Sequence, residues 1–182
     1  MRAAMIDKVI RSFCRLLLAP LLMVATACPV YAEDASETAV KIAFIFNFFK
    51  FIEWPAEVEN RGKFLLCADA EGAVSEGLQM LDGKTVNGKP LSVRRDLKGQ
   101  ALRACHMVYM ENPDTAILRD LSVYPVVTVG DGGDFIQQYG VIGLVPQDNR
   151  LSFVINLTPA QANGIKIRAP LLKLAKTVQA VK

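Results

Sequence analysis

The sequence predicts an α/β fold, a three-layer single domain with a mixed β-sheet flanked by helices. Short apolar runs rich in β-branched residues, such as residues 126–129, are typical of strands buried in a parallel sheet. These runs alternate with segments of helical periodicity. Two late runs, at 141–145 and 151–156, flank a short polar segment and predict an antiparallel hairpin. Together these patterns favour helices on both faces of one sheet.

Residues 1–32 have the pattern of a secretory signal peptide. An apolar stretch at 16–27 follows a basic region, and small residues end the segment at Ala32, so we expect the mature chain to start at Glu33. The apolar run is shorter than the roughly 20 residues that a membrane span needs, although an uncleaved anchor remains an alternative. Lipoprotein processing at Cys28 is another. The prediction places the mature protein in the periplasm, as a domain of residues 33–182.

Removal of this leader changes the charge balance. The full chain has 21 basic and 18 acidic residues and a formal net charge of +3. The leader holds four of the basic residues and one of the acidic ones, so 17 of each remain and the mature chain is formally neutral. A neutral chain gives no electrostatic argument for binding nucleic acid or an anionic membrane.

The segment AVKIAFIFNFFKFIEWP, residues 39–55, is the first predicted helix. It holds five of the nine phenylalanines and the only tryptophan. We expect Asp34 and Glu37 to form a capping box, the helix to reach about Trp54, and Pro55 to stop it. Its polar side chains do not form one broad face, so most sides of the helix must be covered. It is either a central core element or a core element whose far side meets a partner.

The middle of the chain predicts alternating strands and helices. Strands are expected at 64–67, 107–110 and 126–130, and a strand is expected after an Asn87-Gly88 turn. Helices are expected at 74–81 and 112–121, with a loop or single helical turn at 97–104. A turn at 131–134 precedes a short helix at 135–139. This order is that of a sheet whose strands are joined by covering helices.

After the hairpin, the chain predicts two more helices and an edge strand. Thr158 and Pro159 begin a short helix that Asn163 and Gly164 end. Residues 165–168 alternate like an edge strand or extended segment. The last helix is expected to start at Ala169 and Pro170, with one apolar face made of four residues: Leu171, Leu172, Ala175 and Val178.

Two cysteines, Cys67 and Cys105, remain after the leader is removed. An even pair in an oxidising compartment favours a disulfide over two separate buried thiols. One geometric objection stands against the bond. Cys67 ends one predicted strand and Cys105 begins another, so parallel neighbouring strands would place the thiols at opposite ends.

The sequence carries few signals of chemistry. His106 is the only histidine, and a structural role is favoured because metal sites need several convergent ligands. The glycine-rich turn around Asp131 and Asp134 lies where α/β folds bind phosphate, yet its carboxylates oppose an anion and offer only a weak calcium signal. No nucleophile-elbow pattern is present. We therefore predict a protein that is not an enzyme and has no metal or cofactor.

Candidate partner-binding residues come from two regions. On the first helix, we expect Phe46, Phe49 and Trp54 to lie on the side away from the core. Near the end of the chain, Phe153, Ile165 and Ile167 are each most simply read as core, but the segment with Ile165 and Ile167 could be an exposed edge that pairs with another chain.

Several segments together resemble the YfiR family of bacterial periplasmic proteins. The resemblance rests on VKIAFIFNFFKFIEWP at 40–55, on Cys67, on CHMVY at 105–109, and on LSFVINLTPAQANGIKIRAPLLKLAKTV at 151–178. It implies a regulatory protein that binds the periplasmic domain of an inner-membrane diguanylate cyclase and holds the enzyme inactive. It also implies a disulfide between Cys67 and Cys105 and a homodimer. The alternative is a periplasmic carrier or sensor of a small ligand, with its pocket near residues 130–134.

Overall fold

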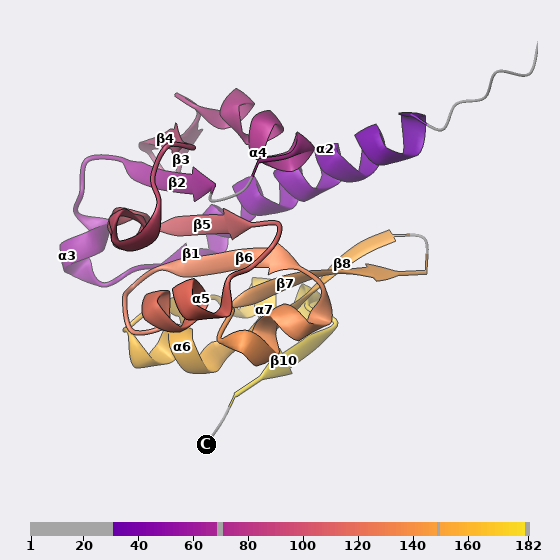
Figure 1. Cartoon of the computed structure of the whole chain (residues 1–182). Helices are drawn as coiled ribbons and strands as arrows, with labels where there is room; N and C mark the ends of the chain where they lie inside the picture. The colour runs from indigo at the N-terminus through magenta and orange to yellow at the C-terminus, as the bar shows by residue number, and fades with distance from the viewer. Residues whose placement is uncertain (1–30, 69–70, 149, 181–182) are drawn as a thin grey trace, which may run out of the picture. The chain divides into compact units, whose positions relative to one another are not determined.

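A mixed β-sheet is the centre of the structure in the residues that the computed structural model describes, 31–68, 71–148 and 150–180 (Figure 1). Across these residues the strand order is β10-β8-β7-β6-β5-β2-β4-β3. The strands are β2 (Phe64–Ala68), β3 (Thr85–Val86), β4 (Lys89–Arg94), β5 (Met107–Met110), β6 (Val127–Asp131), β7 (Ile142–Gln147), β8 (Arg150–Asn156) and β10 (Thr177–Gln179). The predicted leader and its cleavage and lipidation sites lie outside the described residues.

The helices and a small second sheet complete the described part of the chain. The α-helices are α2 (Tyr31–Phe48), α3 (Ala56–Glu59), α4 (Ala73–Leu78), α5 (Thr115–Leu121), α6 (Leu157–Ala162) and α7 (Ala169–Leu174). The 3-10 helices are η1 (Phe49–Phe51), η2 (Gln79–Leu81), η3 (Gly99–Ala104) and η4 (Gly133–Gln138). Strands β1 (Ile52–Glu53) and β9 (Lys166–Ile167) form an antiparallel pair.

The main sheet is parallel from β4 through β7 and antiparallel at the hairpin. Strand β2 pairs in parallel with β4 and β5, and β5, β6 and β7 continue in parallel. Strand β8 returns antiparallel to β7, as the sequence predicts. At the other edge, Asn87 and Gly88 have φ angles of 49° and 78°, the left-handed values of a tight hairpin turn between β3 and β4.

Two hydrophobic cores lie on opposite faces of the sheet, which confirms the predicted α/β class. The α2-side core combines one face of the strands with buried side chains of α2, α4, α6 and α7, including Ile45, Leu78, Ala160 and Leu171. The α5-side core covers the other face with side chains of η3, α5 and η4, including Leu102, Leu118 and Phe135. Helices and sheet therefore form three layers (Figure 1).

The first helix differs from its prediction at both ends. It includes Tyr31, so Asp34 lies inside the helix and does not cap it. It ends at Phe48, and after η1 the chain becomes extended at Ile52, which pairs with Ile167 of β9. The proline at position 55 disfavours helical backbone at the residue before it. Pairing with β9 then fixes the extended conformation earlier than proline alone requires.

The last predicted helix is also shorter than expected. Helix α7 ends at Leu174, and Ala175 has an extended backbone. Val178 lies in β10, which pairs in parallel with β8, and not on a helical face with Leu171 and Leu172. Thr177 and Val178 are β-branched, so they suit a strand once β8 offers its open edge.

The remaining elements agree with their predictions except at one cap. Asp114 caps α5 by accepting a hydrogen bond from the amide of Ala116. Helix α6 is capped two residues earlier than Thr158 and Pro159 suggested, because Asn156 accepts from the amide of Thr158. Among the described helices, we find none with the length and apolar character needed to cross a bilayer.

Candidate functional site

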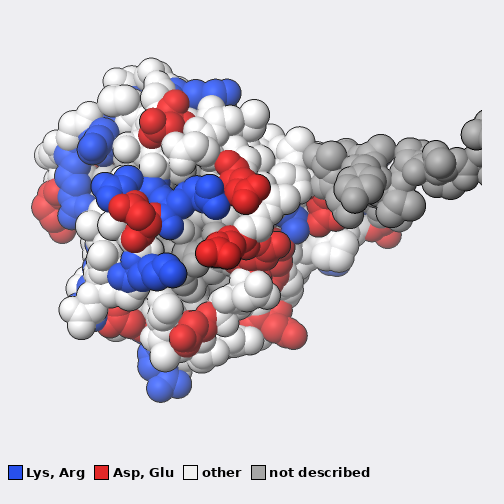
Figure 2. Space-filling model, turned by 45° about the horizontal axis from the view of Figure 1, so that its top comes forward, with Lys and Arg blue, Asp and Glu red and all other residues white. Residues whose placement is uncertain are grey.

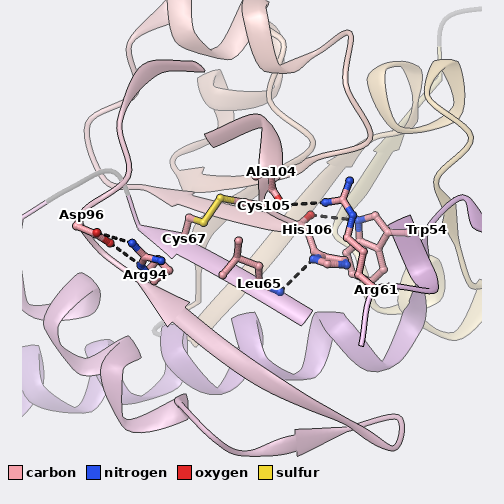
Figure 3. The surroundings of a disulfide bond; sticks show 9 residues. All are labelled: Trp54, Arg61, Leu65, Cys67, Arg94, Asp96, Ala104, Cys105 and His106. Carbon is pink, nitrogen blue, oxygen red and sulfur yellow. Dashed lines mark hydrogen bonds and ion pairs between the residues drawn. A yellow bond between two sulfur atoms is a disulfide. The ribbon is translucent and has the colours of Figure 1, made fainter. Parts of the chain in front are cut away.

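A buried disulfide joins Cys67, near the end of β2, to Cys105, between η3 and β5 (Figure 3). Cys67 and Cys105 are 0% and 1% exposed, and their Cα atoms are 6.1 Å apart. The bond links residues separated by 38 positions. It pins the connection that leaves β4, crosses β2 and enters β5.

The geometric objection raised by the sequence is wrong, although the two strands are parallel neighbours. Cys67 is opposite Val108 in the register of β2 and β5, so a straight β5 would carry Cys105 away from Cys67. However, Cys105 precedes β5 and follows directly on η3, whose Leu102 packs in the α5-side core. The chain therefore approaches the sheet from its α5-side face, and Cys105 lies over Cys67.

His106 is the residue that aligns β5 with β2. The backbone amide of Leu65 donates to its Nδ1 at 3.0 Å, so Nε2 carries the proton and donates to the carbonyl of Val58 at 3.2 Å. The carbonyl of His106 accepts from Nε1 of Trp54 at 3.1 Å. Burial lowers the pKa of His106 to about 4, and the hydrogen bond to Val58 only partly opposes this. The imidazole is a neutral structural group, as the sequence predicts.

The stability of the protein should fall as pH drops from 6.5 to 4, because the unfolded His106 takes up a proton that the folded one excludes. Above pH 6.5, His106 is neutral in both states and does not lower the free energy of unfolding. By pH 4, this free energy should have fallen by about 3 kcal/mol. Urea unfolding across this range measures the change. His106→Asn, whose amide oxygen can accept from Leu65, should show a shallower pH dependence. Equal slopes in the two proteins would contradict this role.

An aromatic cluster surrounds His106 and encloses two of the proposed partner-binding residues. The rings of Phe49, Trp54 and Phe64 lie 5.4–5.6 Å apart, and Trp54 and Phe64 both meet His106 edge-on. Phe49 is 0% exposed and Trp54 is 5% exposed. The expectation that these two side chains lie on an open face is therefore wrong. Phe49 follows Ile42 and Ile45 at the spacing of one helical face, and all three side chains are buried.

The candidates near the end of the chain are mostly core as well. Phe153 is 2% exposed and packs against Phe44 and Phe48, and Ile165 is 1% exposed. Strand β9 pairs with β1 along one edge, and in this two-stranded sheet no described strand pairs with its other edge, so the edge-strand prediction for Ile165 and Ile167 stays a prediction. Ile167 itself stays partly exposed.

Phe46 and Ile167 are thus the candidates with accessible apolar surface, and charged side chains border both. The ammonium of Lys50 lies 5.1 Å from the centre of the Phe46 ring. Ile167 pairs with Ile52, and the residues that follow these two form an ion pair. The Nε atom of Arg168 lies 3.8 Å from a carboxylate oxygen of Glu53. Apolar contacts with a polar border are typical of protein interfaces.

Asp131, the last residue of β6, connects the sheet to α2. Asp131 accepts from Lys41 of α2 at 2.7 Å, and the hydroxyl of Tyr109 lies 3.5 Å from the same carboxylate. Burial would lower the pKa of Lys41, but its hydrogen bonds to Asp131 and Glu37 outweigh burial and raise it. Asp131 thus fastens α2 to the sheet, while Asp134 is exposed at the start of η4. Sequence reasoning missed this pair because the two residues are 90 positions apart.

The described residues contain no group of three or more His, Cys, Asp and Glu side chains arranged to hold a metal ion. On the face drawn in Figure 2, basic and acidic side chains are interspersed, and neither sign covers the whole face. This mixed surface agrees with the neutral balance of the predicted mature chain.

The fold and the site define a class: an α/β domain with a disulfide-pinned crossover and a stripe of aromatic residues packed on its sheet. The family model for YfiR/HmsC-like proteins matches residues 38–176, which include both cysteines and both candidate surface residues. The chain belongs to this family. Its members are periplasmic and regulatory. A search of the curated proteins finds no match to the chain.

Proposed function

We propose that this protein is a periplasmic regulator that binds the periplasmic domain of an inner-membrane diguanylate cyclase and represses the enzyme. Repression lowers cyclic di-GMP and limits biofilm formation. The observation that carries the proposal is the YfiR/HmsC-like match, which extends from α2 to the residue before β10. The predicted signal peptide supports delivery to the compartment where this partner is accessible.

The partly exposed side chains of Phe46 and Ile167 are the proposed contact points. A large ring that is already half-buried loses little conformational freedom when a partner covers it, so it suits an interface anchor. The borders of charged residues give such a contact its orientation and exclude water from its centre. A homodimer through the same surface is a related proposal, which the molar mass in solution tests.

A deletion strain tests the function. Without the gene, cyclic di-GMP and surface attachment should rise, and expression of the native protein should restore both. If neither quantity changes on deletion, the repressor function is wrong. A periplasmic small-ligand carrier would instead leave cyclic di-GMP unchanged.

Complementation with variants tests the contact surface. Phe46→Asp should fail to restore repression, because a carboxylate in the centre of an apolar contact is desolvated without a partner. Met80→Asp is the matched control, since Met80 is 64% exposed and belongs to η2, on a different part of the chain. Both variants should unfold near the native temperature. Full repression by Phe46→Asp would remove this helix side from the interface.

A further inference from the structure

The connections after β2 and β4 leave these neighbouring parallel strands toward opposite faces of the sheet. The chain after β2 enters α4, whose Val74 and Leu78 belong to the α2-side core. The chain after β4 enters η3, whose Leu102 belongs to the α5-side core. The strand order β4-β2-β5-β6-β7 reverses between β2 and β5, so the crevice typical of open α/β sheets belongs to that pair. The diverging connections after β2 and β4 leave a second opening at the carboxyl ends of these two strands.

A cavity of about 450 Å³ lies at this point, which we name the β2–β4 cavity. Its volume is in the range of small-molecule sites. Its walls come from the end of β4 and the residues after it, from one residue before α4, and from the start of η2: Val93, Arg94, Arg95, Asp96, Lys98, Glu71 and Gln79. The cavity is therefore built by the divergence itself.

Two of the charged side chains in the β2–β4 cavity form an ion pair with each other. Arg94 and Asp96 form a two-bond ion pair of 2.7 and 2.5 Å, which neutralises both (Figure 3). Arg95 donates through Nε to the hydroxyl of Ser75 at 3.3 Å, and Ser75 is fully buried. Lys98 forms no ion pair with any described residue. Outside the Arg94–Asp96 pair, the lining therefore has two positive groups, Arg95 and Lys98, and one negative group, Glu71.

The wall that carries these positive groups is held at both ends. Arg94 is opposite Cys67 in the register of β2 and β4, and Cys105 is bonded to the same Cys67. The segment between them, residues 95–104, is thus a short loop whose two flanking residues both contact Cys67 of β2. Because the ends of this loop are held, its backbone loses little conformational entropy when a ligand binds.

We propose that the β2–β4 cavity binds a compact dianion, a small phosphate or dicarboxylate, through Arg95 and Lys98. The Nη groups of Arg95 supply a planar pair of donors for two oxygens, and its Nε bond to Ser75 fixes their direction. Lys98 supplies the second charge. This site is separate from the cyclase contact and does not depend on it.

Isothermal titration of the oxidised protein with inorganic phosphate, and separately with succinate, tests the proposal. Binding of about 1 mM affinity or tighter is expected for at least one of them. Arg95→Gln should weaken it by about tenfold or more, because a charge-assisted contact is lost. Lys98→Gln should also weaken it, whereas Glu71→Gln should tighten it by removing the opposing charge. Arg119→Gln, a charge loss outside the cavity, should leave the affinity unchanged.

The two probes separate the sources of the anion. Binding of phosphate alone or of succinate alone, sensitive to Arg95 and Lys98, supports the site and identifies its ligand class. Absence of binding by both probes overturns the proposal. So does an Arg95→Gln protein that melts at the native temperature and binds as tightly as the native one. An equal loss of affinity in Arg119→Gln would show a net-charge effect and overturns the assignment to this cavity.

Discussion

Replacing both Cys67 and Cys105 by alanine is expected to lower the free energy of unfolding by about 4 kcal/mol. The disulfide closes a loop over 38 positions, and the chain-entropy model gives this magnitude for its effect on the unfolded state. For a domain of this size, the melting temperature should fall by about 10 °C. Thermal unfolding followed by circular dichroism measures the change.

The single variant Cys67→Ser should show a similar loss and should also weaken repression of the cyclase, because the crossover between β4 and β5 is released. The reduced native protein is the matched control, since it lacks the bond but keeps both side chains. If the oxidised and reduced native proteins melt at the same temperature, the disulfide has no structural role.

Phe49→Ala should lower the free energy of unfolding by about 4 kcal/mol, in the range for a large aromatic side chain removed from a core. Phe49 is 0% exposed and packs on both Trp54 and Phe64, so its removal leaves a cavity between α2 and the sheet. Denaturant unfolding at neutral pH measures the loss.

Phe46→Ala is the matched control for this variant. Phe46 lies three residues earlier and is partly exposed, so its truncation should cost clearly less stability. The pair separates the two roles of the aromatic segment, since Phe49 should affect folding and Phe46 should affect partner binding. Equal destabilisation by the two variants would contradict this division.

The strands and the two cores were predictable because their signals are local. The β-branched run before Gly130 and the apolar run at 107–110 are apolar at nearly every position, which is typical of strands buried on both faces of a parallel sheet. The Asn87-Gly88 turn requires left-handed backbone, which these residues adopt readily. In each case the neighbouring residues in the sequence contain the physical reason for the structure.

The misplaced elements depend on contacts between distant residues. Nothing near Ile52 indicates that it will pair with Ile167, and this pairing ends the first helix early. Val178 fits the apolar spacing of a helix, yet it lies in a strand because residues 177–179 pair with β8. Local periodicity is a weak guide where a partner strand competes for the same residues.

The candidate interface was predictable only in part for the same reason. A helical wheel that continues to Trp54 places Phe46, Phe49 and Trp54 on one outer side. Phe49 in fact shares the face of Ile42 and Ile45, which is buried, and the chain is already extended before Trp54, so both side chains are enclosed and Phe46 stays partly exposed. The position of Cys105 over Cys67 likewise depends on where η3 packs, which the prediction of a loop or single helical turn at 97–104 does not specify.

Capture of the partner from the cell envelope tests the central claim most directly. The tagged native protein should retain a membrane diguanylate cyclase after cross-linking in the periplasm, and the Phe46→Asp variant should lose it. Addition of the purified native protein to that cyclase in membranes should then lower its production of cyclic di-GMP. Unchanged cyclase activity at saturating protein, or an envelope capture that holds no diguanylate cyclase, would contradict the account.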